Sequence, residues 1–215
     1  MPKKSSLFYR LICGITRILI RSFYHFRIYG WEHYVSGRAL IAANHCSYLD
    51  PMIVGSFFPE PIHFLARSTL FSSLIGRIIS RLNSHPVNPS FPMDAMKRVI
   101  SLLKEGKKIL LFPEGSRSNT GQLREIRPGI AHLMVHERST ILPIYISGTF
   151  DVWPRSRKWP RPWGRIAMVI GSPIEWDVYA HLSRREAEKS ILQDLDHKFH
   201  QLKEWFDAGD DLPPP

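Results

Sequence analysis

Residues 39–51 read ALIAANHCSYLDP, and this stretch decides the fold. The apolar run from Ala39 to Ala43 is short enough, and apolar enough, to predict a buried strand. At its end, Asp50 is expected to cap a helix from Pro51 to Phe58, because a proline is favoured at the first helical position. A buried strand, a polar turn and a helix in this order are typical of an α/β sheet.

The same alternation continues outward from this stretch. Further buried strands are predicted at 62–66, 108–112, 141–146 and 166–170, with helices at 90–104 and 128–137. Ser183 and Glu186 form a capping box that opens a last helix. We therefore predict an α/β fold, a mixed sheet flanked by helices, with an N-terminal amphipathic membrane-associated helix. The predicted units are a membrane-binding segment (1–28), a catalytic domain (29–206) and a flexible tail (207–215).

The N-terminal segment from 7 to 28 is apolar but interrupted. Its polar positions step by three or four residues, at Arg10, Gly14, Arg17, Arg21 and His25. This spacing gives one narrow polar stripe on a helix that is otherwise apolar. Such a helix suits the plane of a membrane interface rather than a span, although packing on its own domain is the alternative. The arginines also argue against a cleaved signal peptide.

Composition limits the partners. The chain is 44% hydrophobic and 22% charged, as in a globular domain, and carries a net charge of +10. A basic surface suits either nucleic acid or anionic lipid. Cys13 and Cys46 lack the spacing of a zinc ribbon, so we expect no metal site, and a disulfide between them is not expected.

The turn from Asn44 to Asp50 carries candidate chemistry. Side chains at the carboxyl end of a strand open into the usual ligand crevice of an α/β sheet. His45 is a suitable general base, and Asp50 can orient its imidazole if a turn lies between them. The alternative is that these residues only satisfy the backbone of the turn and cap the helix. Cys46 is a poor nucleophile candidate, because adjacent residues point apart.

A second polar turn, Phe112-Pro113-Glu114-Gly115-Ser116-Arg117-Ser118, also follows a predicted buried strand. Gly115 permits a tight turn with exposed amides, and Arg117 offers a planar fork for phosphate. Ser116 adds a hydroxyl, and Glu114 can hold Arg117 or a substrate hydroxyl. A surface salt bridge is the simpler alternative for this turn.

A third feature is the segment from 153 to 165, in which three tryptophans alternate with five basic residues and three prolines. Interleaved tryptophan and arginine suit a lipid headgroup layer. They also suit single-stranded nucleic acid, or a plain proline-rich loop. The apolar N-terminal segment favours lipid.

The two turns together, in this order and each behind a strand, resemble the motifs of the glycerolipid acyltransferase family, which includes the 1-acylglycerol-3-phosphate acyltransferases. The resemblance covers about 28 to 171. It implies direct acyl transfer from acyl-CoA or acyl-carrier protein to the sn-2 hydroxyl of 1-acylglycerol 3-phosphate, with His45 as base and Asp50 orienting it. It implies phosphatidic acid as the product, and no cofactor.

The resemblance also assigns the binding residues. Glu114, Gly115, Ser116 and Arg117 would hold the glycerol phosphate, together with Asn44 and Arg67. One position departs from the family pattern, because Pro89 stands where a phosphate-binding arginine is usual. Glycerol 3-phosphate or another lysophospholipid is therefore an alternative acceptor. A non-catalytic basic protein that binds membranes or nucleic acid is the alternative from another class.

The expected location is the cytoplasmic face of a membrane, as a peripheral or monotopic protein. The expected partners are membrane lipids and the acyl donor, and no nucleic acid.

Overall fold

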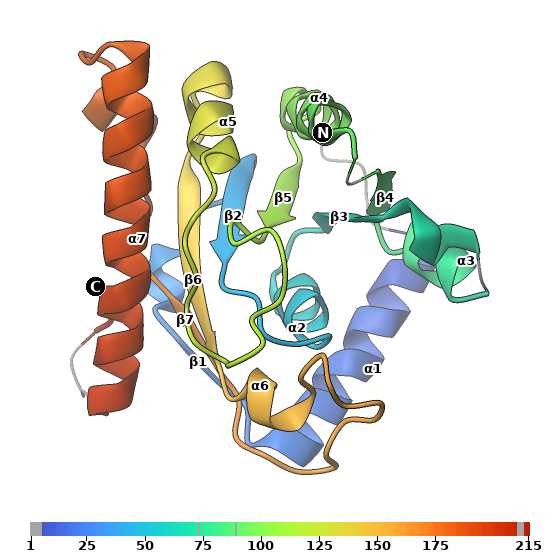
Figure 1. Cartoon of the computed structure of the whole chain (residues 1–215). Helices are drawn as coiled ribbons and strands as arrows, with labels where there is room; N and C mark the ends of the chain where they lie inside the picture. The colour runs from blue at the N-terminus through green and yellow to red at the C-terminus, as the bar shows by residue number, and fades with distance from the viewer. Residues whose placement is uncertain (1–5, 73, 89, 210–212) are drawn as a thin grey trace.

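The chain folds around one seven-stranded sheet (Figure 1). The computed structural model describes residues 6–72, 74–88, 90–209 and 213–215. The strands are β1 (Arg27–Tyr29), β2 (Ala39–Ala43), β3 (Ile62–Arg67), β4 (Ser84–Val87), β5 (Lys108–Leu111), β6 (Ile141–Ser147) and β7 (Ala167–Ile170). The α-helices are α1 (Leu7–Tyr24), α2 (Asp50–Phe57), α3 (Leu74–Ser80), α4 (Pro92–Lys104), α5 (Gly129–Glu137), α6 (Thr149–Val152) and α7 (Arg184–Ala208).

The sheet is mixed, as predicted. Its order is β1-β7-β6-β2-β5-β3-β4, and every pair is parallel except β6 with β7, which is antiparallel. The five predicted strands are present, with boundaries that shift by at most one residue. β1 and β4 were not predicted, because neither contains a run of buried apolar residues. The central position of β2 between β6 and β5 places its carboxyl end in the middle of one sheet edge.

Alternation along β2 builds two cores. Ile41 and Ala43 pack with Ile53 and Val54 of α2 on one face. Leu40 and Ala42 face the opposite way, toward α4, α5 and α7. In Figure 1, α1 and α2 accordingly lie on one side of the sheet, and α5 and α7 on the other. Both faces of a largely parallel sheet must be covered in this way, which is why its strands are apolar throughout.

Helix starts partly differ from the predictions. Ser183 does form the capping box of α7 with Glu186. α4, by contrast, starts at Pro92 rather than at 90. Asp50 does not cap α2: the cap position is Leu49, and the Asp50 carboxylate accepts hydrogen bonds from amides before the helix. The predicted cap is therefore wrong, and the carboxylate is instead held within the turn that precedes α2.

α1 packs on α2 through one side and exposes apolar side chains on the other. Tyr9, Cys13 and Ile20 are buried, and the Tyr9 hydroxyl donates to the Gly55 carbonyl at 2.9 Å. The exposed large apolar side chains are Leu7, Leu11, Ile15, Ile18, Leu19 and Phe23. Packing on the domain, the alternative weighed from the sequence, thus accounts for one side of α1. Among the described residues, no helix has both the length and the apolar character needed to cross a membrane.

The predicted flexible tail spans 207–215, of which the structure describes 207–209 and 213–215. α7 continues to Ala208, and Pro214 is buried. The Pro215 carbonyl accepts a hydrogen bond from the Ser172 amide at 3.0 Å. Pro214 and Pro215 therefore lie against the domain, near the end of β7, while 210–212 lie outside the described residues.

Candidate active site

Asn44 fixes the corner at which β2 ends. Its side-chain amide donates to the Ile146 carbonyl at 3.0 Å, and its side-chain oxygen accepts from the Ile146 amide at 2.7 Å. The side chain thus extends the pairing of β2 with β6 by one step, and only 2% of Asn44 is exposed. Both ends of its side-chain amide are bonded to the backbone of β6, and the substrate-binding role expected for Asn44 stays a prediction.

His45 and Asp50 lie in direct contact across the turn. His45 Nδ1 is 2.8 Å from Asp50 Oδ2, and the same oxygen accepts from the amides of Cys46 and Ser47 at 2.7 Å each. Asp50 is fully buried, whereas the His45 side chain is 18% exposed. The carboxylate is held by the turn that it closes, so it fixes the imidazole by Nδ1. His45 Nε2 makes no hydrogen bond with any described residue and is left for a ligand.

The second turn lies directly beside the first. Because β5 pairs in parallel with β2, both turns lie at the same edge of the sheet. The Phe112 ring stacks on the His45 imidazole with 3.8 Å between centroids. The His45 amide donates to Glu114 Oε1 at 3.2 Å, and the Ser118 amide donates to the His45 carbonyl at 2.7 Å. The structure thus brings the two predicted motifs into a single site.

Glu114 is a buried carboxyl group, 2% exposed. Burial raises its pKa to about 7, with a further increase from the Asp50 charge, against the lowering effects of the His45 amide and Arg124. Its second oxygen, Oε2, is buried and has no hydrogen-bond partner within the described chain. Buried polar atoms are rarely left unpaired, so Oε2 marks a position where a bound hydroxyl could donate.

Gly115 makes the second turn possible. Its φ is +75°, which glycine adopts without strain, and a Cβ there would lie 2.6 Å from Arg127 Nε. The neighbouring Ser116 is held by Arg124, whose Nη1 donates to the Ser116 hydroxyl at 2.6 Å. Ser116 is therefore already engaged, and Arg124 and Arg127 are two basic residues of the site that the motif alone did not indicate.

Arg117 is stacked on the aromatic ring of Tyr48. Its guanidinium carbon lies 3.6 Å from the centroid of the Tyr48 ring, and the Trp153 ring lies 5.2 Å from that ring. Arg117 Nη1 is buried without a partner in the described residues. A guanidinium stacked on an aromatic face keeps its donors free for an anion. Tyr48 and Trp153 were missed from the sequence, because the stack joins residues 105 positions apart.

Arg67 is the last residue of β3 and is exposed. Since β3 runs parallel to β5, Arg67 lies at the same edge of the sheet as the two turns. Pro89, the position that departs from the family pattern, lies outside the described residues.

Unpartnered polar atoms gather around this edge. Seven buried side-chain nitrogen or oxygen atoms lack a partner among the described residues, and five of them belong to Asp50, Glu114, Arg117, Thr149 and Trp153. Each of these residues lies in one of the two turns or in the segment 149–153, whose Trp153 carbonyl accepts from Ser47. Such clustering indicates a ligand site rather than a packing defect.

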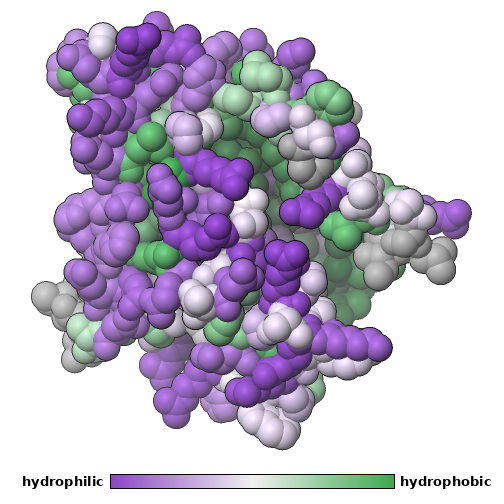
Figure 2. Space-filling model, viewed as in Figure 1, coloured by the Kyte–Doolittle hydropathy of each residue, from purple (hydrophilic) through white to green (hydrophobic). Residues whose placement is uncertain are grey.

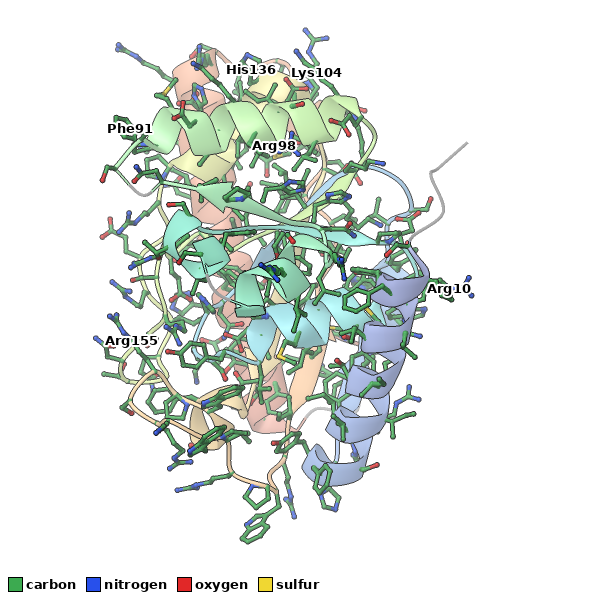
Figure 3. All side chains as sticks on the ribbon, turned by 90° about the vertical axis from the view of Figure 1, so that its right-hand side faces the viewer. Arg10, Phe91, Arg98, Lys104, His136 and Arg155 are labelled. Carbon is green, nitrogen blue, oxygen red and sulfur yellow. The ribbon has the colours of Figure 1, made fainter. Side chains whose placement is uncertain are left out.

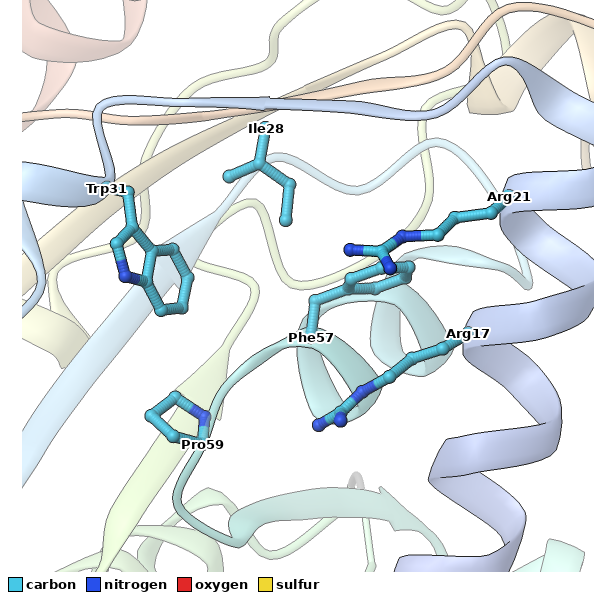
Figure 4. Close-up of a pocket in the computed structure, with 6 residues that line it drawn as sticks. All are labelled: Arg17, Arg21, Ile28, Trp31, Phe57 and Pro59. Carbon is cyan, nitrogen blue, oxygen red and sulfur yellow. The ribbon is translucent and has the colours of Figure 1, made fainter.

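A hollow of about 380 Å³ adjoins this site, lined by Ser118, Asn119, Phe150, Pro154, Arg155 and Ser156. A second hollow, of about 410 Å³, lies at the far end of α2, where Arg21 of α1 lies over the Phe57 ring and Trp31 lies across the hollow from Arg17 and Arg21 (Figure 4). Arg17 there bonds the carbonyls of Ser56 and Phe58. The second hollow contains no residue of either motif. No cluster of three or more potential metal ligands occurs in the described part of the chain.

Comparison with known proteins assigns the chain. The model of the family described as Acyltransferase matches residues 25–147, more than half of the sequence. This chain belongs to the Acyltransferase family. The match begins at the end of α1 and ends with β6, so it contains both turns.

Curated relatives carry a narrower name. The chloroplastic 1-acyl-sn-glycerol-3-phosphate acyltransferase of Arabidopsis thaliana is 28% identical over 83% of this chain and 51% of its own length. The 1-acyl-sn-glycerol-3-phosphate acyltransferase of Bacillus subtilis is 26% identical over 78% of this chain and 82% of its own. The chain thus spans about half the length of the plant relative and most of the bacterial one.

The fold is that of a solved acyltransferase. The crystal structure of the 1-acyl-sn-glycerophosphate acyltransferase of Thermotoga maritima matches with a TM-score of 0.72 at 22% identity, over 91% of this chain and 80% of that one. The predicted α/β fold with a mixed, helix-flanked sheet is confirmed.

Proposed function

We propose that this acyltransferase moves a fatty acyl group from acyl-CoA or acyl-carrier protein to the sn-2 hydroxyl of 1-acylglycerol 3-phosphate, giving phosphatidic acid. The observation that carries the proposal is the contact of His45 Nδ1 with buried Asp50 at 2.8 Å, with Nε2 left free beside the turn of Glu114 to Arg117. The names of the curated relatives support the same reaction.

The proposed chemistry is a direct transfer. His45 Nε2 takes the proton of the acceptor hydroxyl as its oxygen attacks the thioester carbonyl carbon, forming the new C–O bond. The C–S bond then breaks, and the leaving thiolate takes the proton from the imidazolium. Asp50 stabilises the imidazolium while it exists and orients the ring through Nδ1. No acyl-enzyme is formed, and no residue changes its oxidation state.

The second turn provides the acceptor contacts in this proposal. Arg117, with a buried and unpartnered Nη1, binds the phosphate, and Arg67 contributes from the same sheet edge. Gly115, whose own amide donates to the Phe112 carbonyl, permits the turn; Ser116 contributes its backbone amide, and Glu114 Oε2 accepts from a glycerol hydroxyl. This last role suits a carboxyl group whose pKa is raised to about 7, since either protonation state can bond a hydroxyl.

Acceptor profiling tests the proposal. Membranes containing the protein are incubated with labelled acyl-CoA or acyl-carrier protein and a panel of acceptors: 1-acylglycerol 3-phosphate, glycerol 3-phosphate and other lysophospholipids. The expected result is labelled phosphatidic acid, with His45→Ala membranes as the blank. Preferred acylation of glycerol 3-phosphate or of a phosphate-free acceptor would overturn the assignment of the acceptor.

We further propose that residues 1–28 hold the domain of 29–206 at the cytoplasmic face of a membrane without spanning it. The support is the set of large apolar side chains that α1 exposes on the side away from α2. Flotation of the full chain with vesicles, compared with a variant in which Leu11, Ile15 and Ile18 are serine, tests this. Equal flotation of both proteins would contradict it.

A further inference from the structure

The loop from 153 to 165 exposes two large aromatic side chains. Trp159 and Trp163 are 71% and 72% exposed, whereas tryptophan is ordinarily mostly buried. Between and beside them, Arg155, Lys158, Arg161 and Arg165 are exposed as well. Asp151, just before the loop, is the one acidic residue between 149 and 166. The loop is thus an exposed surface that combines aromatic rings with positive charge.

This loop is bonded to the end of α1. The Tyr24 hydroxyl donates to the Arg161 carbonyl at 2.8 Å, and the Ile166 amide donates to the Tyr24 carbonyl at 3.0 Å. In Figure 1 the loop runs past the C-terminal end of α1. Phe23, the last exposed apolar residue of α1, is adjacent in sequence to Tyr24, which is bonded to this loop. Figure 2 shows that the side chains over α7, on the other side of the molecule, are mainly hydrophilic.

The same loop is bonded to the active site. Pro154 forms a β-bridge with Ser47, and the Ser47 hydroxyl donates to the Trp153 carbonyl at 2.8 Å. Pro154, Arg155 and Ser156 line the hollow of about 380 Å³ that Ser118 also lines. A surface that binds the exposed part of the loop would therefore also orient the hollow, because both belong to the same segment.

We propose that the loop of residues 155–165 is a second membrane contact, which binds an anionic bilayer beside α1 and places the hollow next to the active site at the lipid surface. With the hollow at the lipid surface, a lipid acceptor can reach the active site from the bilayer. Only this delivery of the acceptor rests on the proposed function; the membrane contact itself does not. Trp159 and Trp163 enter the headgroup layer, where tryptophan is favoured, and the basic side chains pair with lipid phosphates.

The side chains of this loop and of α1 favour a bilayer over two other binding partners, single-stranded nucleic acid and a second copy of this chain. Single-stranded nucleic acid would use the tryptophans and the arginines but has no contact to make with the aliphatic side chains of α1. A second copy of this chain would have to bring acidic side chains to a surface with this charge, and the protein as a whole carries a net charge of +10. A bilayer with anionic headgroups accommodates both the apolar and the basic parts.

The test is binding of the full chain to vesicles of phosphatidylcholine with and without phosphatidylglycerol. Trp159→Ala/Trp163→Ala should lower the affinity for the anionic vesicles by at least about ten-fold. Lys158→Gln/Arg165→Gln should lower it by about ten-fold or more at low salt and should reduce the difference between the two vesicle types. Met93→Ala/Val178→Ala is the control, because both side chains are exposed to a similar degree elsewhere, at 62% and 63%.

In Figure 3, Phe91, two residues before the control position Met93, lies well above Arg155, the labelled residue of this loop. All variants must melt within a few degrees of the wild type, which the exposure of the replaced side chains predicts. Unchanged vesicle binding of both loop variants would overturn the proposal. So would a loss of self-association, or of single-stranded DNA binding, while vesicle binding stays the same.

Turnover separates this inference from the proposed function. With a monomeric, short-chain 1-acylglycerol 3-phosphate, the tryptophan variant should match the wild type, whereas with a long-chain acceptor in vesicles its rate should fall about ten-fold. Equal rates in vesicles would overturn delivery by this loop. Absence of turnover with both acceptors in the wild type would refute the proposed function, while the vesicle-binding result would still decide the membrane contact.

Discussion

Replacing Asp50 with asparagine removes one charge at the centre of the proposed site and little else. Asparagine can place its oxygen where Oδ2 accepts from His45 Nδ1 and from the amides of Cys46 and Ser47. Its NH₂ then takes the place of Oδ1, which is buried and has no partner in the part of the chain that the structure describes. The imidazole therefore stays in position, but the carboxylate that would stabilise its cationic form is gone.

The size of the effect follows from the 2.8 Å contact. A unit charge pair at about 4 Å is worth about 4 kcal/mol at the effective dielectric of a protein site, and the imidazolium carries most of its charge only near the transition state. A loss of about 3–4 kcal/mol corresponds to a fall of about 10²–10³-fold in kcat. KM for the acceptor should change by less than about three-fold, because no acceptor contact in the proposal involves Asp50.

The assay is release of free CoA from acyl-CoA with saturating 1-acylglycerol 3-phosphate. Ser47→Ala is the matched control: it removes the two hydrogen bonds of the Ser47 hydroxyl, donated to the Trp153 carbonyl and accepted from the Leu49 amide, but leaves the Ser47 amide and the Asp50 carboxylate in place. This control should lose about 1 kcal/mol of stability and keep kcat within about three-fold. A folded Asp50→Asn protein with turnover within three-fold of the wild type would refute the role assigned to the charge.

Three further changes test other parts of the site. In urea unfolding, Glu114→Gln should become more stable relative to the wild type as pH rises from 5 to 8, by up to about 3 kcal/mol. The pKa of Glu114 is raised from 4.5 to about 7 in the folded protein, so the wild type loses stability over this range, whereas glutamine does not titrate. Parallel curves of stability against pH for the two proteins would contradict the raised pKa. Tyr48→Leu should raise KM for the phosphate acceptor by about five- to ten-fold, with little change in kcat, because Arg117 loses the ring on which it stacks. Tyr48→Phe keeps the ring and should have the KM of the wild type. Equal KM values in the two variants would exclude a role of the stack in acceptor binding. Gly115→Ala, at φ +75°, should lower the free energy of unfolding by about 1–2 kcal/mol and weaken acceptor binding. A variant as stable as the wild type would show that this turn accepts a side chain without strain.

The central strands could be predicted because burial on both faces leaves an uninterrupted apolar run. Ala39–Ala43 is such a run, and it is fully buried. β1 and β4 lie at the two edges of the sheet and are partly exposed, so their sequences, RIY and SHPV, carry no comparable pattern. The capping box of α7 was predictable for a different reason: its residues are three positions apart and satisfy each other locally.

The site was predictable where the residues that meet are close in sequence, and less so elsewhere. The spacing of His45 and Asp50 requires a turn, which the structure contains. The partners of the Asp50 carboxylate were not predicted. An aspartate at a helix cap usually accepts from amides inside the helix, whereas Asp50 accepts from the amides of Cys46 and Ser47, which precede it. Asn44 bonds a strand 102 positions away, and Arg117 stacks on Tyr48, which is supported by Trp153. Those partners depend on the order of strands in the sheet, and no local pattern encodes that order.

The most direct test of the proposed reaction is the single-turnover rate of His45→Ala, with labelled acyl donor and 1-acylglycerol 3-phosphate at saturating concentrations. The proposed mechanism predicts no labelled phosphatidic acid above the uncatalysed background, in a protein whose thermal unfolding and vesicle binding match those of the wild type. Transfer at a rate near that of the wild type would contradict the role of His45 as the base, and with it the mechanism proposed for this site.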